Sequence, residues 1–168
     1  MPDLAPFHTL FVTVHVLGVI LFVLAHGVSA FVLLRIRSER DPAALRTLLS
    51  LSRQSFGVMI IGFLAWFLVG IVAGFSGNWW TSGRYWIWAS LGIAVVLTGV
   101  MTPFGRLYFN RIREALGVDV NTGAYNPEFH ADPVAVNAAI ASGRPAMVAT
   151  LGVAGLLIMG WLMVAKPF

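Results

Sequence analysis

Three histidines in the first apolar run are the residues of this chain best placed to do chemistry. His8, His15 and His26 follow one another at spacings of seven and eleven residues. At about 100° per residue, both spacings return to within about 20° of the starting direction, so a helix would carry all three on one face. Histidine inside an apolar segment of membrane length is costly, and it usually faces a partner, a cofactor or a water-filled cavity. The pattern therefore predicts a functional face on this helix.

Neutral imidazole binds haem iron and copper, so the histidine face predicts haem b or copper bound by His15, His26 and His8. One metal cannot contact all three, because the spacings separate them by about 10 and 16 Å along the helix. The later apolar runs contain no histidine. A second ligand would come from a methionine, such as Met59 or Met101, or from a second copy in a homodimer. We expect His15→Ala to abolish any bound haem or metal while the protein still inserts.

The alternative interpretation is that the histidines serve packing alone. They would then hydrogen-bond neighbouring helices through backbone carbonyls or hydroxyl groups, for which Thr98, Thr102 and Thr150 are candidates. The chain would be a non-catalytic accessory or assembly subunit of a larger membrane complex. The predicted spans contain no Asp or Glu, and the sequence has no phosphate-binding loop, carboxylate pair or Ser/His/Asp set. It therefore gives no support for an enzyme.

Four apolar runs must position these residues. The chain has 168 residues, of which 58% are hydrophobic and 11% charged, against roughly 25% charged residues in an ordinary soluble domain. A helix needs about 20 apolar residues to cross a bilayer. We therefore predict an all-α, integral membrane four-helix bundle in contact with lipid, with helices over about 7–34, 56–75, 85–104 and 146–165.

The arginines predict how this bundle is oriented. The connections 35–55 and 105–145 contain five and four arginines, respectively. The positive-inside rule places these connections in the cytoplasm and both termini outside. Nucleic acid is not expected as a partner, because no basic stripe is interleaved with aromatic residues. Cysteine is absent, which excludes disulfides and thiolate metal sites.

Two segments of the chain resemble each other. Asp41-Pro42 precedes the second apolar run and Asp132-Pro133 precedes the fourth, and an arginine follows each Asp by twelve residues, at Arg53 and Arg144. Asp can cap a helix and Pro suits its first turn. Two tandem helical hairpins would give this pattern, and so would two helices that begin alike.

A glycine pair, a group of tryptophans and a loop histidine are three further features of the sequence. Gly70 and Gly74 form a Gly-x-x-x-Gly pair, which predicts close helix approach within the chain. Tryptophans near residues 76–88 indicate an aromatic belt at the outer membrane surface. His130 lies in the turn-rich segment 117–131 and is predicted to be a solvated loop histidine.

The first helix and the last residues also resemble a known family. The run 10–18 (LFVTVHVLG), with Ala25-His26-Gly27 after it, resembles the opening helix of small bacterial inner-membrane proteins of the CopD-like type. The ending Met163-Val-Ala-Lys166-Pro167 is similar to that of a four-helix branch of the group. The resemblance implies a multi-pass protein of a bacterial-type inner membrane, with copper handling or haem b at the matching His15. The chain departs from the family pattern because its later helices lack histidine.

Overall fold

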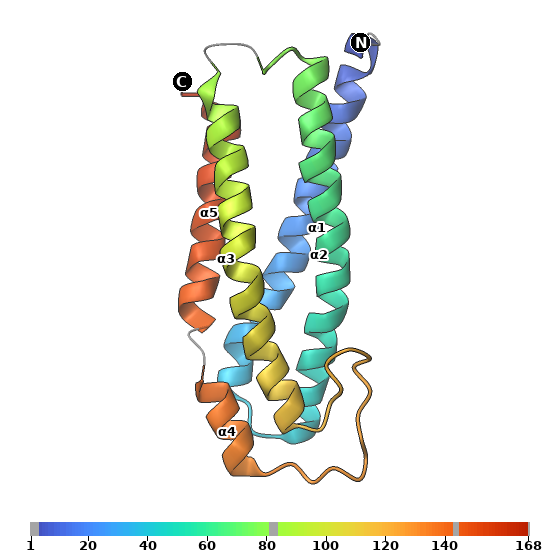
Figure 1. The fold of residues 1–168 in the computed structure, drawn as a ribbon, viewed down its shortest axis with the longest axis vertical. Helices are drawn as coiled ribbons and strands as arrows, with labels where there is room; N and C mark the ends of the chain where they lie inside the picture. The colour runs from blue at the N-terminus through green and yellow to red at the C-terminus, as the bar shows by residue number, and fades with distance from the viewer. Residues whose placement is uncertain (1–3, 81–83, 143–144, 168) are drawn as a thin grey trace.

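The computed structural model describes residues 4–80, 84–142 and 145–167, and over these residues the chain is almost entirely helical. Arg144, one of the arginines of the predicted cytoplasmic connection, lies outside the described residues. Figure 1 shows a bundle of long helices with both termini at one end. Its elements are η1 (Ala5–Phe7), α1 (His8–Arg35), η2 (Ile36–Ser38), α2 (Pro42–Ser76), α3 (Tyr85–Ala115), α4 (Pro133–Ala141) and α5 (Pro145–Ala165).

Four helical stretches are long and apolar enough to cross a membrane: Ala5–Ser38, Pro42–Ser76, Tyr85–Ala115 and Pro133–Ala165. Each presents large apolar side chains on its outer surface, among them Leu24, Ile61, Val96 and Leu157. Large apolar side chains on an outer surface are favourable in contact with lipid and unfavourable in contact with water. The predicted all-α four-helix membrane bundle is therefore confirmed, and its outward faces contact the bilayer.

The helices extend beyond the predicted apolar runs. α2 begins at Pro42 and not near residue 56, α3 continues to Ala115 and not to about 104, and α4 lies inside the predicted 105–145 connection. Hydropathy marks only the part of a helix that lies in lipid, whereas backbone hydrogen bonding continues into polar sequence. Both predicted caps are confirmed. The Asp41 carboxylate accepts from the backbone N–H groups of Ala43 and Ala44, and the Asp132 carboxylate accepts from that of Val134.

The bundle consists of two hairpins. α1 packs along most of α2, and α3 packs along α5, while contacts between the two pairs are sparse. This arrangement is the one that two tandem hairpins would give, although an evolutionary duplication stays a prediction. The sparse contact between the pairs is what leaves space in the middle of the molecule.

Close approach within the first hairpin depends on Gly18 and Gly62. A Cβ at Gly18 would lie 2.6 Å from the backbone nitrogen of Trp66, and one at Gly62 would lie 2.7 Å from that of Phe22. Gly70 and Gly74, the Gly-x-x-x-Gly pair predicted to allow close helix approach, have another role. A Cβ at Gly70 would meet the His15 ring, and one at Gly74 would meet the Trp80 ring. Gly70 and Gly74 therefore make room for rings, and close helix approach occurs elsewhere.

We expect Gly18→Ala to destabilise the protein by about 1–3 kcal/mol, because the added methyl group would push the two helix backbones apart. Gly27→Ala is the matched control on α1, since nothing lies within 4 Å of a Cβ at Gly27. Thermal unfolding in detergent would measure both variants. Equal midpoints for the two variants would contradict the proposed close approach.

Two apolar clusters join the hairpins at opposite ends of the bundle. We call the end that contains η2, α4, the start of α2 and the end of α3 the arginine-rich end. Its cluster is the larger, and the Tyr108 hydroxyl within it donates to the carbonyl of Ile140 over 3.0 Å. Trp86, Ile87 and Leu162 of α3 and α5 form the second cluster near the termini, and Trp79 and Trp80, which follow α2, pack against it. The hairpins are thus held at both ends, and the candidate site lies between them.

Candidate functional site

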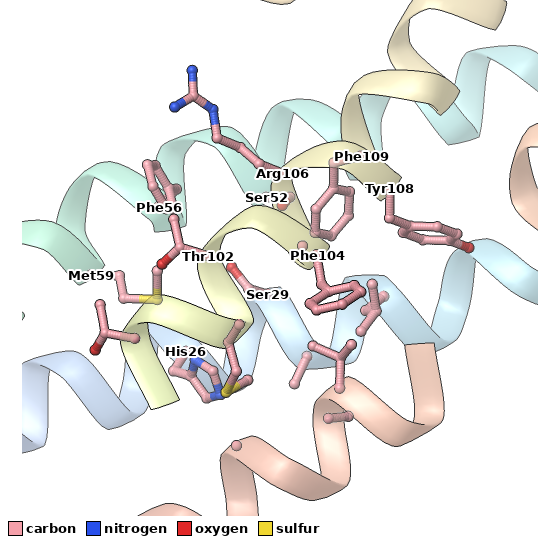
Figure 2. Close-up of a pocket in the computed structure, with 18 of the residues that line it drawn as sticks. His26, Ser29, Ser52, Phe56, Met59, Thr102, Phe104, Arg106, Tyr108 and Phe109 are labelled. Atoms are coloured by element: carbon pink, nitrogen blue, oxygen red, sulfur yellow. The ribbon is translucent and has the colours of Figure 1, made fainter. Parts of the chain in front are cut away.

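A cavity of about 1000 Å³ lies between the two hairpins and receives side chains from α1, α2, α3 and α5. We call it the interhairpin cavity. Its walls are mainly apolar, and the hydroxyl groups of Ser29, Ser52, Thr98 and Thr102 interrupt them. Figure 2 shows His26 at this cavity together with Met59 and Thr102. Four methionines line it in all: Met59, Met101, Met147 and Met159.

His26 is the histidine of the stripe that lines this cavity. Its Nε2 atom is buried and has no hydrogen-bond partner within the described residues. The ring stacks on that of Phe22, with centroids 5.6 Å apart and planes at 13°. A buried polar atom without a partner costs about 1–3 kcal/mol, so such an atom calls for an explanation.

Gly152 and Met101 border the free nitrogen of His26. The position of a Cβ at Gly152 would lie 2.6 Å from His26 Nε2 and 2.8 Å from Met101 Cε. An imidazole nitrogen from α1 and a methionine methyl group from α3 therefore pack against α5 at a position where glycine has no side chain. Nitrogen and thioether sulfur together form a donor pair suited to haem iron or copper.

His15 instead contacts α2. Its Nδ1 lies 2.6 Å from the carbonyl oxygen of Trp66. Because a carbonyl only accepts, this nitrogen carries the proton and donates. The ring fits against Gly70, where a Cβ would lie 2.6 Å from Nδ1. His15 does not line the interhairpin cavity.

His8 also binds α2, near the termini. Its Nδ1 lies 2.9 Å from Ser76 Oγ, and that hydroxyl donates to the carbonyl of Ala73. The serine has one proton to give, so the histidine nitrogen donates to the serine. The His8 ring also meets Trp79 edge-on, with centroids 5.1 Å apart.

The structure divides the predicted site residues into two groups. His26, Met59 and Met101 line one cavity, whereas His15 and His8 lie against α2. The predicted hydrogen-bond partners Thr98, Thr102 and Thr150 are not the ones found, because the two bonds go to the Trp66 carbonyl and to Ser76. The prediction of cofactor loss therefore shifts from His15 to His26.

Trp66 is a cavity residue that the sequence did not single out. Its indole Nε1 is buried and, like His26 Nε2, has no partner in the part of the chain that the structure describes. Its ring meets that of Phe22 at 6.0 Å, which places Trp66, Phe22 and His26 along one wall. Trp66 lies in mid-span and not at a membrane surface, where tryptophan is usual. This mid-span position was the signal in the sequence that could have identified Trp66.

At the arginine-rich end, segment 117–131 borders the cavity, to which it contributes Val120 and Asn121. Arg53 of α2 donates to the carbonyl of Asn121, and the Arg46 guanidinium lies over the Tyr125 ring at 3.7 Å. These contacts fasten the segment to α2. His130 is exposed on this segment, and its Nδ1 donates to the nearby carbonyl of Glu128 over 3.0 Å.

Asp119 should make this segment sensitive to acid. The backbone N–H and hydroxyl of Thr122 hold the pKa of its carboxyl below the ordinary value of 3.8, with help from the N–H of Asn121. A lowered pKa means that the carboxylate stabilises the folded turn above that value, and that this contribution disappears as the pH falls through the lowered pKa. We expect faster hydrogen exchange of Thr122 and Ala124 in Asp119→Asn at neutral pH. Unchanged exchange would contradict this role.

The described residues contain no group of three or more His, Cys, Asp or Glu side chains that could hold a metal ion. A metal at His26 would therefore draw its other ligands from methionine sulfur or from a macrocycle that carries its own donors. Comparison of the chain with family models, with curated proteins and with solved structures gives no match.

Proposed function

We propose that this chain is an integral membrane electron-transfer protein that binds a haem b in the interhairpin cavity, where His26 would hold the iron. The observation that carries the proposal is the buried, unpartnered Nε2 of His26, a residue that lines the cavity and packs beside Gly152 and Met101. The proposal accounts for the cost of leaving that nitrogen without a hydrogen bond, because iron would take up its lone pair.

The size of the cavity favours haem over a bare ion. Cofactor sites typically enclose about 300–1,000 Å³, and this cavity measures about 1000 Å³. A copper ion bound to His26 and Met101 would leave most of that space unfilled. Copper remains the second candidate, because imidazole and thioether ligands suit Cu(I).

The residues of the chain would have three tasks. His26 would supply the imidazole nitrogen, and Met101 is a thioether whose methyl group packs beside it at Gly152. The apolar walls, including Phe22 and Phe63, would exclude water and so influence the reduction potential. When bound, a haem supplies a one-electron iron couple. The proposal agrees with what the CopD-like resemblance implies, but it assigns the ligand to His26 instead of His15.

An absorption spectrum of the detergent-purified protein, oxidised and dithionite-reduced, tests the proposal, with metal analysis on the same sample. We expect a Soret band and a reduced-minus-oxidised α-band, with iron near one atom per chain. Stoichiometric copper without these bands would favour the copper site. A colourless, metal-free protein that co-purifies with a larger complex would overturn the proposal in favour of an accessory subunit.

A further inference from the structure

The charged side chains that line the interhairpin cavity all have one sign. Arg53 of α2 and Arg106, Arg111 and Arg113 of α3 line it, and no Asp or Glu in the described part of the chain does. All four lie toward the arginine-rich end, and the methionines Met59 and Met101 lie deeper among apolar residues. The cavity is therefore amphipathic along its length, with an apolar body and a cationic end.

Two of these arginines are held where they can serve a ligand. Arg53 donates through Nη2 to the carbonyl of Asn121, and Arg113 donates through Nη1 to Asn110 Oδ1 over 3.0 Å. A guanidinium has five N–H donors, so each retains several for another acceptor. Arg106 is not among the arginines proposed to contact a ligand, because Figure 2 shows its guanidinium pointing away from the other labelled side chains.

Neither of these two arginines forms an ion pair within the described residues, although Asp119 lies near enough to Arg53 for the arginine charge to help lower the pKa of its carboxyl. The ion pair found within the described residues joins Arg35 to Glu39, neither of which lines the cavity. The positive-inside rule explains why arginines gather at this end of the bundle. It does not explain why Arg53 and Arg113 line the cavity while Arg40, on the connection between α1 and α2, does not.

We infer that the cavity takes an amphiphile whose apolar body fills the space between the hairpins and whose carboxylate or phosphate contacts Arg53 and Arg113. Guanidinium pairs with both groups through two parallel hydrogen bonds. The inference rests on the proposed function in that haem b is one such molecule, since it carries two carboxylates. An anionic phospholipid shares the same chemistry.

Iron-free protoporphyrin IX and its dimethyl ester test this inference without any contribution from metal ligation. The two share the apolar ring, and only the first carries negative charge. Porphyrin fluorescence anisotropy with the detergent-solubilised protein would give both affinities. We expect the acid to bind at least about tenfold more tightly, because each charge-assisted hydrogen bond adds substantially to affinity. Equal affinities for acid and ester would overturn the inference.

Arginine variants test which residues cause the preference for the porphyrin acid over its ester. Arg53→Gln with Arg113→Gln should abolish the preference for the acid, while Arg40→Gln, an exposed arginine outside the cavity, should retain it. Arg53→Lys keeps the charge and should retain part of the preference, which covers the case in which the double variant does not fold. A preference that survives the double substitution would contradict the assignment.

The proposed function can fail separately from this inference. His26→Ala should keep the preference for the porphyrin acid, because no iron is present, although it should lose haem. Native mass spectrometry of the purified protein distinguishes the two sources of the anionic group, since haem and an anionic phospholipid differ in mass. A co-purified ligand that lacks an acidic group would count against the inference.

Discussion

Gly152→Ala is expected to lower haem affinity by about tenfold or more while the protein still folds. The new methyl carbon would lie 2.6 Å from His26 Nε2 and 2.8 Å from Met101 Cε, against the proposed imidazole ligand. Overfilling a packed site costs about 1–3 kcal/mol, and about 1.4 kcal/mol corresponds to a tenfold change in affinity. Both neighbouring atoms are the ends of side chains that can rotate away. The substitution should therefore weaken haem binding without destabilising the fold.

Gly160→Ala is the matched control for this substitution. It lies on the same helix, α5, and nothing lies within 4 Å of a Cβ there. Haem titration of both apoproteins, followed at the Soret band, would measure the affinities, and thermal unfolding would check the fold. If the two alanine variants bound haem equally well, the space beside Gly152 would not be part of the site.

The second large effect concerns the histidines, which should separate into two kinds. His26→Ala is expected to abolish the α-band of the reduced protein, because it removes the only histidine that lines the cavity. His15→Ala should keep the band but lose about 0.5–1.5 kcal/mol of stability, because it removes the hydrogen bond to the Trp66 carbonyl. Reduced-minus-oxidised spectra and unfolding midpoints of both variants would measure these effects.

His8→Ala is the control for this pair of variants. Its hydrogen bond to Ser76 lies near the termini, outside the cavity. We expect normal haem content and a modest loss of stability. A spectrum altered in His15→Ala or His8→Ala, with His26→Ala unchanged, would place the ligand against α2 and refute the assignment to the cavity.

Much of the fold could be predicted from the sequence because membrane-spanning helices are long, apolar and free of charged residues. The charge-free runs located all four spans, and Asp41-Pro42 and Asp132-Pro133 located the starts of α2 and α4. The extensions of α2 and α3 beyond those runs were missed, since polar helical turns leave no mark in hydropathy. α4 was missed as a helix of its own, because nine residues are too few to cross a membrane.

The candidate site was predicted only in part. The common face of His8, His15 and His26 follows from helical spacing, but spacing on one helix says nothing about which neighbour that face meets. α1 approaches α2 closely at Gly18 and Gly62, whereas His26 lies opposite Gly152 of α5. One straight stripe therefore contacts two different helices along its length. Met59 and Met101 were among the predicted ligands, while Trp66 and the cavity arginines emerged only from the packing of the two hairpins.

The measurement that tests the central claim most directly is chemical rescue of His26→Gly by imidazole. Removing the side chain leaves a space that free imidazole can fill, and the added base then supplies the missing nitrogen. We predict that the purified variant lacks the reduced-minus-oxidised α-band of the wild-type protein, and that haem together with imidazole restores it. A variant whose spectrum equals that of the wild type without imidazole, or a wild-type protein that binds no haem, would contradict the account.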